Sequence, residues 1–426
     1  MIKTDKLTDV ISGESRQMLG KLYGTDSAVM QKQVTRIGGL INKFKSFSDA
    51  QEASLFTSPG RTEIGGNHTD HNYGRVLAGA VNLDNIAVAA PNNSNVIRIM
   101  SEGYPAFEVD LSNLHPDKSE RYTSTSLVRG ICSRMKELGY AIGGFDACID
   151  GGVPKGSGLS SSASFEVLIG AIVSDFFNSG SIEPITNAIV GQYAENNFFG
   201  KPCGLMDQTA CAMGGLITID FKDPSKPIVK KVDFDFVATG FKLVITDTGG
   251  NHAYLNDEYA SLPSDMKAVA AELGAKVLRQ VSLDQVLEII PRIRKKVGDR
   301  AILRAIHFEK DNQRVVDQVA ALERNDFIAF LQMVIDSGYS SYMYNQNIFP
   351  VNNVREQGVS LALALSDLVL KGQGAWRVHG GGFAGTIQAF VPEHLVEKYK
   401  STLEHVYGLG SCQSLFIREM GAGKII

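Results

Sequence analysis

The segment from Gly144 to Phe177 constrains the fold most, because a strand pattern gives way there to a glycine-rich loop and then to a helix pattern. GFDACID is typical of a strand, PKGSGL supplies the loop, and the apolar residues of SASFEVLIGAIVSDFF recur at helical spacing. Because glycine lacks a Cβ, the backbone N–H groups of such a loop can approach a ligand closely.

The chemistry expected of this loop follows from the three serines, Ser160, Ser161 and Ser162, that begin the helix. A helix N-terminus offers unpaired N–H donors and a partial positive charge, which suit a phosphate group. The same residues fit an N-capped helix after a flexible turn equally well, since serine is a favoured cap. The loop is not a Walker A loop, because no Gly-Lys-Ser/Thr follows its glycines.

Composition indicates a soluble globular protein. The 426 residues suggest two or three domains, and 44% apolar with 21% charged residues is ordinary for this class. A formal charge of −4 argues against a nucleic-acid partner, and no run of about 18 apolar residues predicts a membrane span. The N-terminal residues have no signal-peptide core, and the five scattered cysteines include no C-x-x-C. We expect a cytoplasmic protein without a disulfide framework or structural zinc.

Strand and helix patterns are mixed along the chain. The first fifty residues have helical spacing, VLAGAVNLDNIAVAAP from Val76 is typical of a strand, and long helical tracts run from Ser264 to Asp336. The segment DPSKP, at 223–227, is the best candidate for a domain boundary. The order predicts an α+β chain of two lobes, 1–225 and 226–426.

A second glycine-rich segment, HGGGFAG from His379 to Gly385, matches the pattern G-x-G-x-x-G. A dinucleotide fold requires a helix directly after these glycines, whereas TIQAFV is typical of a strand. A Rossmann fold is therefore not expected. The segment predicts a tight loop between paired strands, with close approach to a ligand as the alternative.

Two further segments carry polar groups in glycine-rich surroundings. In GLMDQ, Asp207 needs a partner if it is buried, and an arginine would keep it ionised; alone, it is more often a structural acid. GRTEIGGNHTDHNYG, from Gly60, contains His68, Asp70 and His71. Zinc would need a further ligand from elsewhere, and no H-E-x-x-H is present. Short polar side chains on such a loop fit recognition of a polyol better.

Together these segments resemble the GHMP small-molecule kinases, and among them the galactokinase family. GRTEIGGNHTDHNYGRVLAGA is similar to that family's first motif, GRxNLIGEHTDYNxGxVLPxA. GSGLSSSASFE and HGGGFAGTIQAFV resemble its second and third motifs, and PCGLMDQ and RAIHFEKDNQRV match further galactokinase segments. The resemblance spans about Ser58 to Val391, and the order and spacing of its motifs make it specific.

The resemblance implies a two-lobed GHMP kinase fold, with an N-terminal lobe like ribosomal protein S5 domain 2 and a ferredoxin-like C-terminal lobe. ATP and a sugar would meet between the lobes. It implies catalytic roles for Asp207 and Arg61, and Mg²⁺ ligands at Ser162 and Glu195. The implied sugar-binding residues are Asn67, His68, Asp70, Gly204 and Tyr259. The implied ATP-binding residues are Gly156, Ser157, Gly158, Leu159, Ser160, Ser161 and Ser162.

The first motif departs from the family pattern at three positions that bear on the sugar. The Glu of GEHTD is Asn67 here, the residue two before it is Gly65 rather than an aliphatic residue, and the Tyr that usually follows HTD is His71. In galactokinases that Glu contacts the C6 hydroxyl of the sugar, so the C6 substituent stays open. A uronic acid would avoid a Glu and tolerate an Asn, which makes galacturonate a competitor.

The resemblance implies an ATP-dependent sugar 1-kinase, acting on galactose or on a relative such as galacturonate or N-acetylgalactosamine. The alternative from another class is a non-catalytic sugar and ATP sensor, but such relatives are altered in the serine loop, and GLSSSAS is intact here. A kinase for homoserine or mevalonate would lack the HTD segment. We expect a monomer or weak oligomer, and the sequence leaves regulation and the role of the extended N-terminal segment open.

Overall fold

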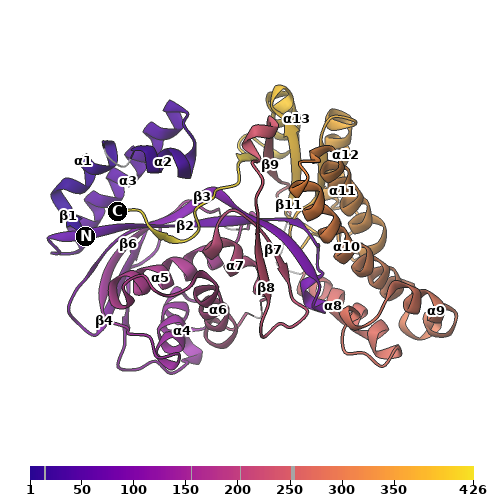
Figure 1. Cartoon of the computed structure of the whole chain (residues 1–426), viewed down its shortest axis with the longest axis horizontal. Helices are drawn as coiled ribbons and strands as arrows, with labels where there is room; N and C mark the ends of the chain where they lie inside the picture. Colours follow the sequence, from indigo (N-terminus) through magenta and orange to yellow (C-terminus); the bar gives the residue numbers. More distant parts are fainter. Residues whose placement is uncertain (14–15, 155, 202, 251–254) are drawn as a thin grey trace.

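The computed structural model describes residues 1–13, 16–154, 156–201, 203–250 and 255–426. Lys155 and Pro202, which belong to the quoted PKGSG and PCGLMDQ segments, lie outside these ranges. Figure 1 shows a large sheet with helices above and below it, joined to a second sheet and a group of long helices.

The larger sheet has nine strands. They are β1 Ile2–Lys3, β2 Glu52–Gly65, β3 Arg75–Pro91, β4 Val96–Ser101, β5 Phe107–Asp110, β6 Phe145–Gly151, β7 Leu216–Asp220, β8 Ile228–Val232 and β13 Gly423–Lys424. The order is β1–β2–β3–β6–β4–β5, while β7 pairs with β3, β8 with β7, and β13 with β2. The long antiparallel pair of β2 and β3 forms the centre, and the GGNHTDHNYG residues connect its two strands.

Helices cover both faces of this pair. Leu55, Ile86 and Val88 pack against α1 Leu7–Ser12, α2 Arg16–Tyr23 and α3 Ser27–Phe47, whereas Phe56 and Ala87 pack against α4 Ser124–Glu137 and α5 Ser161–Asn178. Neighbouring residues of a strand point to opposite faces, so the two sets alternate along the chain. Because both faces are buried, polar residues do not mark a solvent side in β2. Figure 1 shows α1–α3 on one side of the sheet and α4, α5 and α6 Pro184–Ala194 on the other.

The second sheet is antiparallel and has the order β10–β11–β9–β12. Its strands are β9 Phe241–Asp247, β10 Ala375–Val378, β11 Thr386–Pro392 and β12 Cys412–Leu415. The helices of this half are α8 Asn256–Glu272, α9 Leu283–Val297, α10 Asp299–Glu323, α11 Phe327–Ser340, α12 Gly358–Leu370 and α13 Val396–Tyr407. Val378 and Phe390 bury their side chains against these helices from opposite faces of the sheet.

The two halves share chain segments. β8 lies beyond residue 225 yet pairs with β7 of the first sheet, and β13 returns from the C-terminus to pair with β2. Figure 1 shows the C-terminal segment running back towards the N-terminus. The division at 225/226 stays a prediction, and strands from both sides of it build the first sheet.

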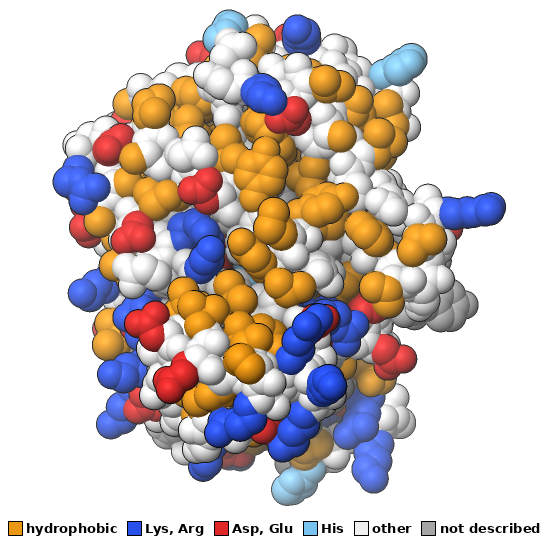
Figure 2. All heavy atoms as spheres, turned by 90° about the vertical axis from the view of Figure 1, so that its right-hand side faces the viewer, with side chains coloured by type: hydrophobic (Ala, Val, Ile, Leu, Met, Phe, Trp, Pro, Cys, Tyr) orange, Lys and Arg blue, Asp and Glu red, His pale blue; other side chains and the backbone are white. Residues whose placement is uncertain are grey.

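One face of the molecule combines apolar and charged side chains. Figure 2 shows hydrophobic side chains across its middle and charges of both signs towards its edges. Exposed apolar residues on α11 and α12 include Ile328, Tyr339, Leu361 and Leu368. Such patches often mark contact surfaces, so this face is the one to examine for the oligomeric state. None of the helices in the described ranges has the length and apolar character of a membrane span.

Candidate functional site

The glycine-rich loop lies between β6 and α5, as the strand and helix patterns predict. Gly156 and Gly158 have φ values of 75° and 70°, and Ser160, the N-cap residue of α5, has a φ of 58°. Glycine adopts such values without steric cost, whereas a serine there is uncommon. A Cβ on Gly158 would lie 2.9 Å from both Nδ1 of His379 and Oγ1 of Thr386, so the first glycine loop packs directly against the second.

Ser160 does not cap the helix that it precedes. The N-cap side chain of α5 makes no hydrogen bond to the first turn, and its hydroxyl instead donates to Oδ2 of Asp207. The interpretation as an ordinary serine-capped helix is therefore wrong. This arrangement directs Ser160 to the acidic residue and leaves the N–H groups of the first turn without a cap from that side chain.

Arg61 and Asp207 form the central ion pair of the site. Nε of Arg61 donates to Oδ1 of Asp207 over 2.8 Å, and Nη2 donates to Oδ2 over 2.7 Å. Arg61 is buried at the β-bulge of β2, and its Nη1 also donates to the carbonyl of Gly158. A two-pronged pair of this kind fixes the orientation of the carboxylate as well as its charge. Arg61 therefore connects Asp207 to the glycine-rich loop. An interpretation of Asp207 as a purely structural acid has to explain this connection.

The Asp207 carboxylate is held in its ionised form. Burial would raise the pKa of Asp207, but the Arg61 charge and the hydrogen bond from Ser160 outweigh it, and the pKa lies below its usual value. Asp207 also lies in the first turn of α7, Met206–Met213, where the helix dipole favours an anion. About one third of the side chain, 34%, stays exposed. The carboxylate can therefore accept a hydrogen bond from a ligand hydroxyl.

Asp70 and Gly204 meet at a neighbouring cavity. A Cβ on Gly204 would lie 2.7 Å from Oδ2 of Asp70, so glycine is required for this approach. The two residues line a cavity of about 90 Å³ together with His71, Tyr73 and Gln192, among others. The predicted sugar-binding residues Asp70 and Gly204 are thus brought together.

His68 and Tyr259 contact the second glycine-rich loop. Nε2 of His68 lies 2.9 Å from the Gly381 carbonyl, and the Tyr259 hydroxyl donates to the Gly382 carbonyl over 3.0 Å. Burial lowers the pKa of His68 to about 3, so its ring is neutral at pH 7. A carbonyl only accepts, so Nε2 carries the proton and Nδ1 is left as an acceptor. Tyr259 on α8 packs edge-on against Phe383.

Asn67, which the resemblance assigns to the sugar, lies in a buried polar network. The residue is fully buried, and its side-chain NH₂ donates to Oε1 of Glu63 and to the Gly380 carbonyl over 2.9 and 2.8 Å. Its side-chain oxygen accepts from Ser341 and Asn347. An amide has two donor hydrogens and two lone pairs, and all of them are used within the protein. A buried polar network thus occupies the Asn67 side chain, and contact of Asn67 with the sugar stays a prediction.

The same network explains the burial of Glu63. Nη2 of Arg377 contacts Oε1 of Glu63 at 2.6 Å, and the Arg377 side chain is fully buried. Burial raises the pKa of Glu63, and the Arg377 charge opposes this rise. No pattern in the sequence indicates this ion pair, which joins residues 314 positions apart.

The two predicted Mg²⁺ ligands lie next to each other. Oγ of Ser162 is 3.4 Å from Oε1 of Glu195, at the start of the π-helical turn Glu195–Phe199. Nε2 of Gln208 donates to Glu195 over 3.0 Å and to Glu166 over 2.9 Å. A hydroxyl and one carboxylate suit Mg²⁺, which keeps several waters and takes further oxygens from phosphates. The residues fit the ion, although the described part of the chain contains no group of three or more His, Cys, Asp or Glu ligands.

Sequence reasoning missed Glu166 and Gln208. Burial, followed by the nearby Glu195 charge, raises the pKa of Glu166 well above its usual value, so the Glu166 carboxyl favours its neutral form. Gln208 thus contacts both Glu195 and Glu166 and fixes the position of the Glu195 carboxylate. The only available signal was the position of Glu166 on the helix of the SSSASFE segment, where the helical pattern alone predicts ordinary packing.

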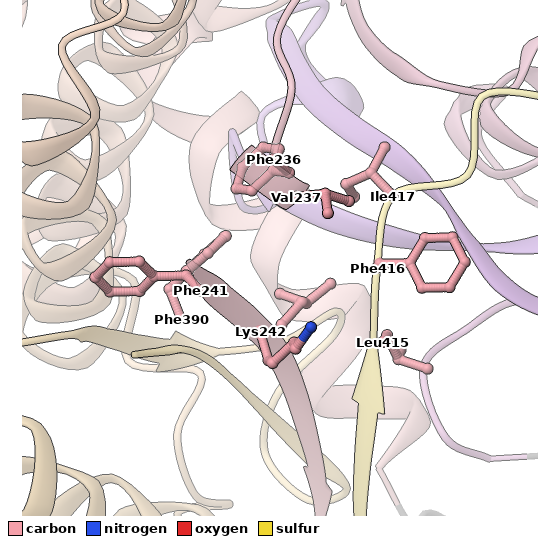
Figure 3. Close-up of a pocket in the computed structure, with 9 residues that line it drawn as sticks. Phe236, Val237, Phe241, Lys242, Phe390, Leu415, Phe416 and Ile417 are labelled. Atoms are coloured by element: carbon pink, nitrogen blue, oxygen red, sulfur yellow. The ribbon is translucent and has the colours of Figure 1, made fainter. Parts of the chain in front are cut away.

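A second cavity lies apart from these residues. Figure 3 shows it between residues 236–243, Phe390 and the C-terminal residues 415–417. Its volume is about 20 Å³, and Lys242 is the one charged residue among those that line it. This volume holds about one water molecule, so the cavity is a packing feature of the junction between the sheets.

Comparisons with known proteins identify the same segments. Residues 126–215 match the family model for the GHMP kinases N terminal domain, and residues 42–91 match the galactokinase galactose-binding signature. A galactokinase of Streptomyces coelicolor is 28% identical over 380 residues, which cover 87% of this chain and 92% of the relative.

Solved structures share the fold. The crystal structure of Lactococcus lactis galactokinase complexed with galactose has a TM-score of 0.75 and 24% identity, covering 91% of this chain and 99% of that one. Methanococcus jannaschii mevalonate kinase has a TM-score of 0.59 at 15% identity, covering 87% and 99%. The two-lobed α+β fold expected from the sequence is confirmed.

Proposed function

We propose that this chain, which resembles the GHMP kinases and among them the galactokinases, transfers the γ-phosphoryl group of ATP to the anomeric hydroxyl of galactose. The observation that carries the proposal is the contact of Asp207 with both Arg61 and Ser160. This contact places an ionised carboxylate at the N-terminus of a helix that follows a glycine-rich loop. A hydroxyl held by Asp207 would therefore face a phosphate held by the loop.

Each residue has a defined task in this reaction. The N–H groups of the Gly156–Ser162 loop and of the first turn of α5 bind the phosphates. Asp207 accepts the hydrogen bond, and at transfer the proton, of the sugar hydroxyl. The hydroxyl oxygen forms a bond to the γ-phosphorus while the bond from that phosphorus to the β,γ-bridging oxygen breaks, leaving ADP. Arg61 keeps Asp207 ionised and adds positive charge next to the transferred group.

The magnesium requirement is part of the proposal. Ser162 and Glu195 would hold Mg²⁺, and the ion would neutralise the charge of the β- and γ-phosphates. Gln208 supports this assignment, because its hydrogen bond to Oε2 fixes the Glu195 carboxylate next to Ser162.

Asp70, Gly204 and His68 would recognise the sugar. Asp70 accepts hydrogen bonds from hydroxyl groups, and the neutral ring of His68 offers Nδ1 as an acceptor. Gly204 leaves room for the ligand beside Asp70. Tyr259 would act at the edge of the same site, where it packs against Gly381 and Phe383.

The sugar is tested by measuring ADP release with galactose, galacturonate, N-acetylgalactosamine, arabinose and glucose. We expect galactose to give the highest kcat/KM and a product whose phosphate is bonded to C1 by ³¹P–¹H correlation. The Asn67 side chain is buried, so replacing the Glu of the family motif by Asn changes the protein interior and not the contact with the C6 substituent of the sugar. This burial supports galactose over galacturonate. A higher kcat/KM for galacturonate would select that sugar, and binding of sugar and ATP without ADP release would favour the sensor.

A further inference from the structure

We propose that Arg36, on the N-terminal helix α3, is a positioning residue for the phosphate-binding loop. Arg36 lies on the opposite side of the sheet from α5, and its guanidinium reaches the end of β6, where the loop begins. The inference rests on the proposed function, since it assigns this loop to ATP. It also gives the N-terminal helices, whose role the sequence left open, a part in nucleotide binding.

The first half of the arrangement is a buried charge cluster around Asp84 of β3. Asp84 is fully buried and accepts hydrogen bonds from Arg36, Tyr23, Thr57 and Arg418. Nη1 of Arg36 lies 2.9 Å from Oδ1, and Arg418 contacts Oδ2 at 2.8 Å. With a second guanidinium on Asp84, the cluster keeps one ion pair when Arg36 is removed. Arg36 is therefore not the only residue that neutralises this buried carboxylate.

The second half connects Arg36 to the loop itself. Nε and Nη2 of Arg36 donate to Oδ1 of Asp150 over 3.1 and 3.0 Å, and Asp150 is the penultimate residue of β6. Nη2 also donates to the Asp84 carbonyl over 2.9 Å, and the N–H of Gly152 donates to the same oxygen over 2.9 Å. The guanidinium thus fixes both the side chain before the loop and the backbone acceptor that anchors its first residues.

The surroundings of Gly152 show how closely the Arg36 guanidinium approaches the loop. A Cβ at this position would lie 2.6 Å from Nη2 of Arg36 and 2.6 Å from the Asp84 carbonyl. A side chain there would displace either group, so the start of the loop packs against Arg36 without space between them. The guanidinium and Gly152 are therefore in direct packing contact, and the guanidinium supports Gly152 from the side of α3.

The far end of the loop is anchored from the adjacent residue of β3. Nδ2 of Asn85 donates to the Ser161 carbonyl and to Oγ of Ser164, at the start of α5. The N–H of Arg61 donates to the Leu159 carbonyl over 3.0 Å. Asp84 and Asn85 thus hold the two ends of one loop, and Arg36 connects the first end to the N-terminal helices. Groups that must meet a phosphate within a few tenths of an ångström need this kind of support.

Tyr23 provides a matched control. Its hydroxyl donates to Oδ2 of Asp84 over 2.7 Å, it is buried, and it belongs to the same group of N-terminal helices. This hydrogen bond ends at Asp84 and does not reach Asp150 or Gly152. Tyr23→Phe therefore perturbs the same buried cluster, while Arg36→Ala and Asp150→Ala release the loop.

The test measures binding of a fluorescent ATP analogue, KM for ATP, KM for the sugar and the unfolding midpoint for each variant. We expect Arg36→Ala to weaken nucleotide binding and raise KM for ATP by about 10- to 100-fold, because a misplaced loop loses several phosphate contacts. KM for the sugar should stay within about twofold. Asp150→Ala should give the same pattern, and added guanidinium ion should partly restore nucleotide binding to Arg36→Ala. Tyr23→Phe should lower the midpoint alone.

Unchanged nucleotide binding in folded Arg36→Ala and Asp150→Ala would overturn the inference, as would equal increases in both KM values. If Arg36→Ala does not fold, Asp150→Ala and Arg36→Lys decide the matter, because a lysine cannot span both carboxylates. The proposed function fails separately, when the wild type binds no ATP analogue or binds it without releasing ADP in the presence of sugar. If the wild type and the variants all bind the ATP analogue equally well, only the role of Arg36 is rejected and the proposed function stands.

Discussion

Arg61 donates two hydrogen bonds, of 2.8 and 2.7 Å, to the two carboxylate oxygens of Asp207, and Ser160 donates a third from the phosphate-type loop. One carboxylate is thereby oriented by one residue from β2 and one from the N-terminus of α5. Since the side chain keeps 34% of its surface exposed, it can also accept a ligand hydroxyl. This relationship supports the first prediction.

Asp207→Asn should lower kcat by about 10²- to 10⁴-fold, because an amide cannot take the proton of the sugar hydroxyl. The amide keeps the size of the side chain, so the circular dichroism spectrum and ATP binding should match the wild type. Steady-state ADP release and binding of the ATP analogue check both statements. Turnover within a few-fold of wild type would remove Asp207 from the proposed role.

Arg61→Met should move the acidic limb of the kcat/KM profile to higher pH. In the wild type, Arg61 helps to hold the pKa of Asp207 below its usual value against the opposing effect of burial. Without the guanidinium, burial dominates and the pKa rises, so the ionised fraction falls at a higher pH. A pH series of kcat/KM for both proteins measures the shift. A limb that stays in place while activity drops would indicate that Arg61 acts only on the phosphate.

The Arg61–Asp207 ion pair also contributes to stability, and the lowered pKa of Asp207 determines how this contribution changes with pH. Asp207 has a depressed pKa when folded, so its contribution is present above the unfolded pKa and is lost as pH falls through the folded pKa. Unfolding by urea at a series of acidic pH values should therefore show a smaller stability difference between wild type and Asp207→Asn as pH decreases. A difference that grows on acidification would contradict an ionised Asp207.

Some of this arrangement could be predicted from the sequence and some could not. The strand, loop and helix around Gly156 follow from local patterns, and β3 is visible in its run of apolar residues. The full length of β2 is not, because both of its faces are buried and its residues Ser54, Thr57 and Ser58 interrupt the apolar run. Periodicity marks a strand clearly only when one face meets water.

Some residues of the site could likewise be predicted from the sequence, and others could not. Arg61, Asp70, Gly204 and Asp207 lie in recognisable segments, and the structure brings them together in two adjoining groups. The contacts of Arg36 with Asp84 and Asp150 span 48 and 114 positions. In the sequence these are charged residues like those of any surface, and only the pairing of β3 with β6 places the two carboxylates side by side. Burial of Asn67 is likewise a tertiary effect.

Gly204→Ala should raise KM for the sugar while KM for ATP stays nearly constant. The added methyl group would lie 2.7 Å from Oδ2 of Asp70, so Asp70 must turn away from its place in the cavity. Initial-rate measurements with each substrate varied in turn separate the two constants. Gly39→Ala provides the matched control, because it also adds a methyl group at a glycine without a positive φ, and there the methyl group meets open space. Equal changes in both constants for Gly204→Ala would argue against a sugar site at Asp70.

Asn67→Ala separates the two roles that this residue has been given. If Asn67 is part of the buried network, its loss removes one hydrogen-bond partner from each of Glu63 and Asn347 and lowers the free energy of unfolding by about 1–3 kcal/mol. The order of preference among galactose, galacturonate and N-acetylgalactosamine should then stay unchanged in the protein that remains folded. Urea unfolding and the ratios of kcat/KM for the three sugars measure the two effects. A reversed sugar preference at unchanged stability would place Asn67 against the C6 substituent, as the galactokinase pattern implies, and would reject the buried role derived from its hydrogen bonds.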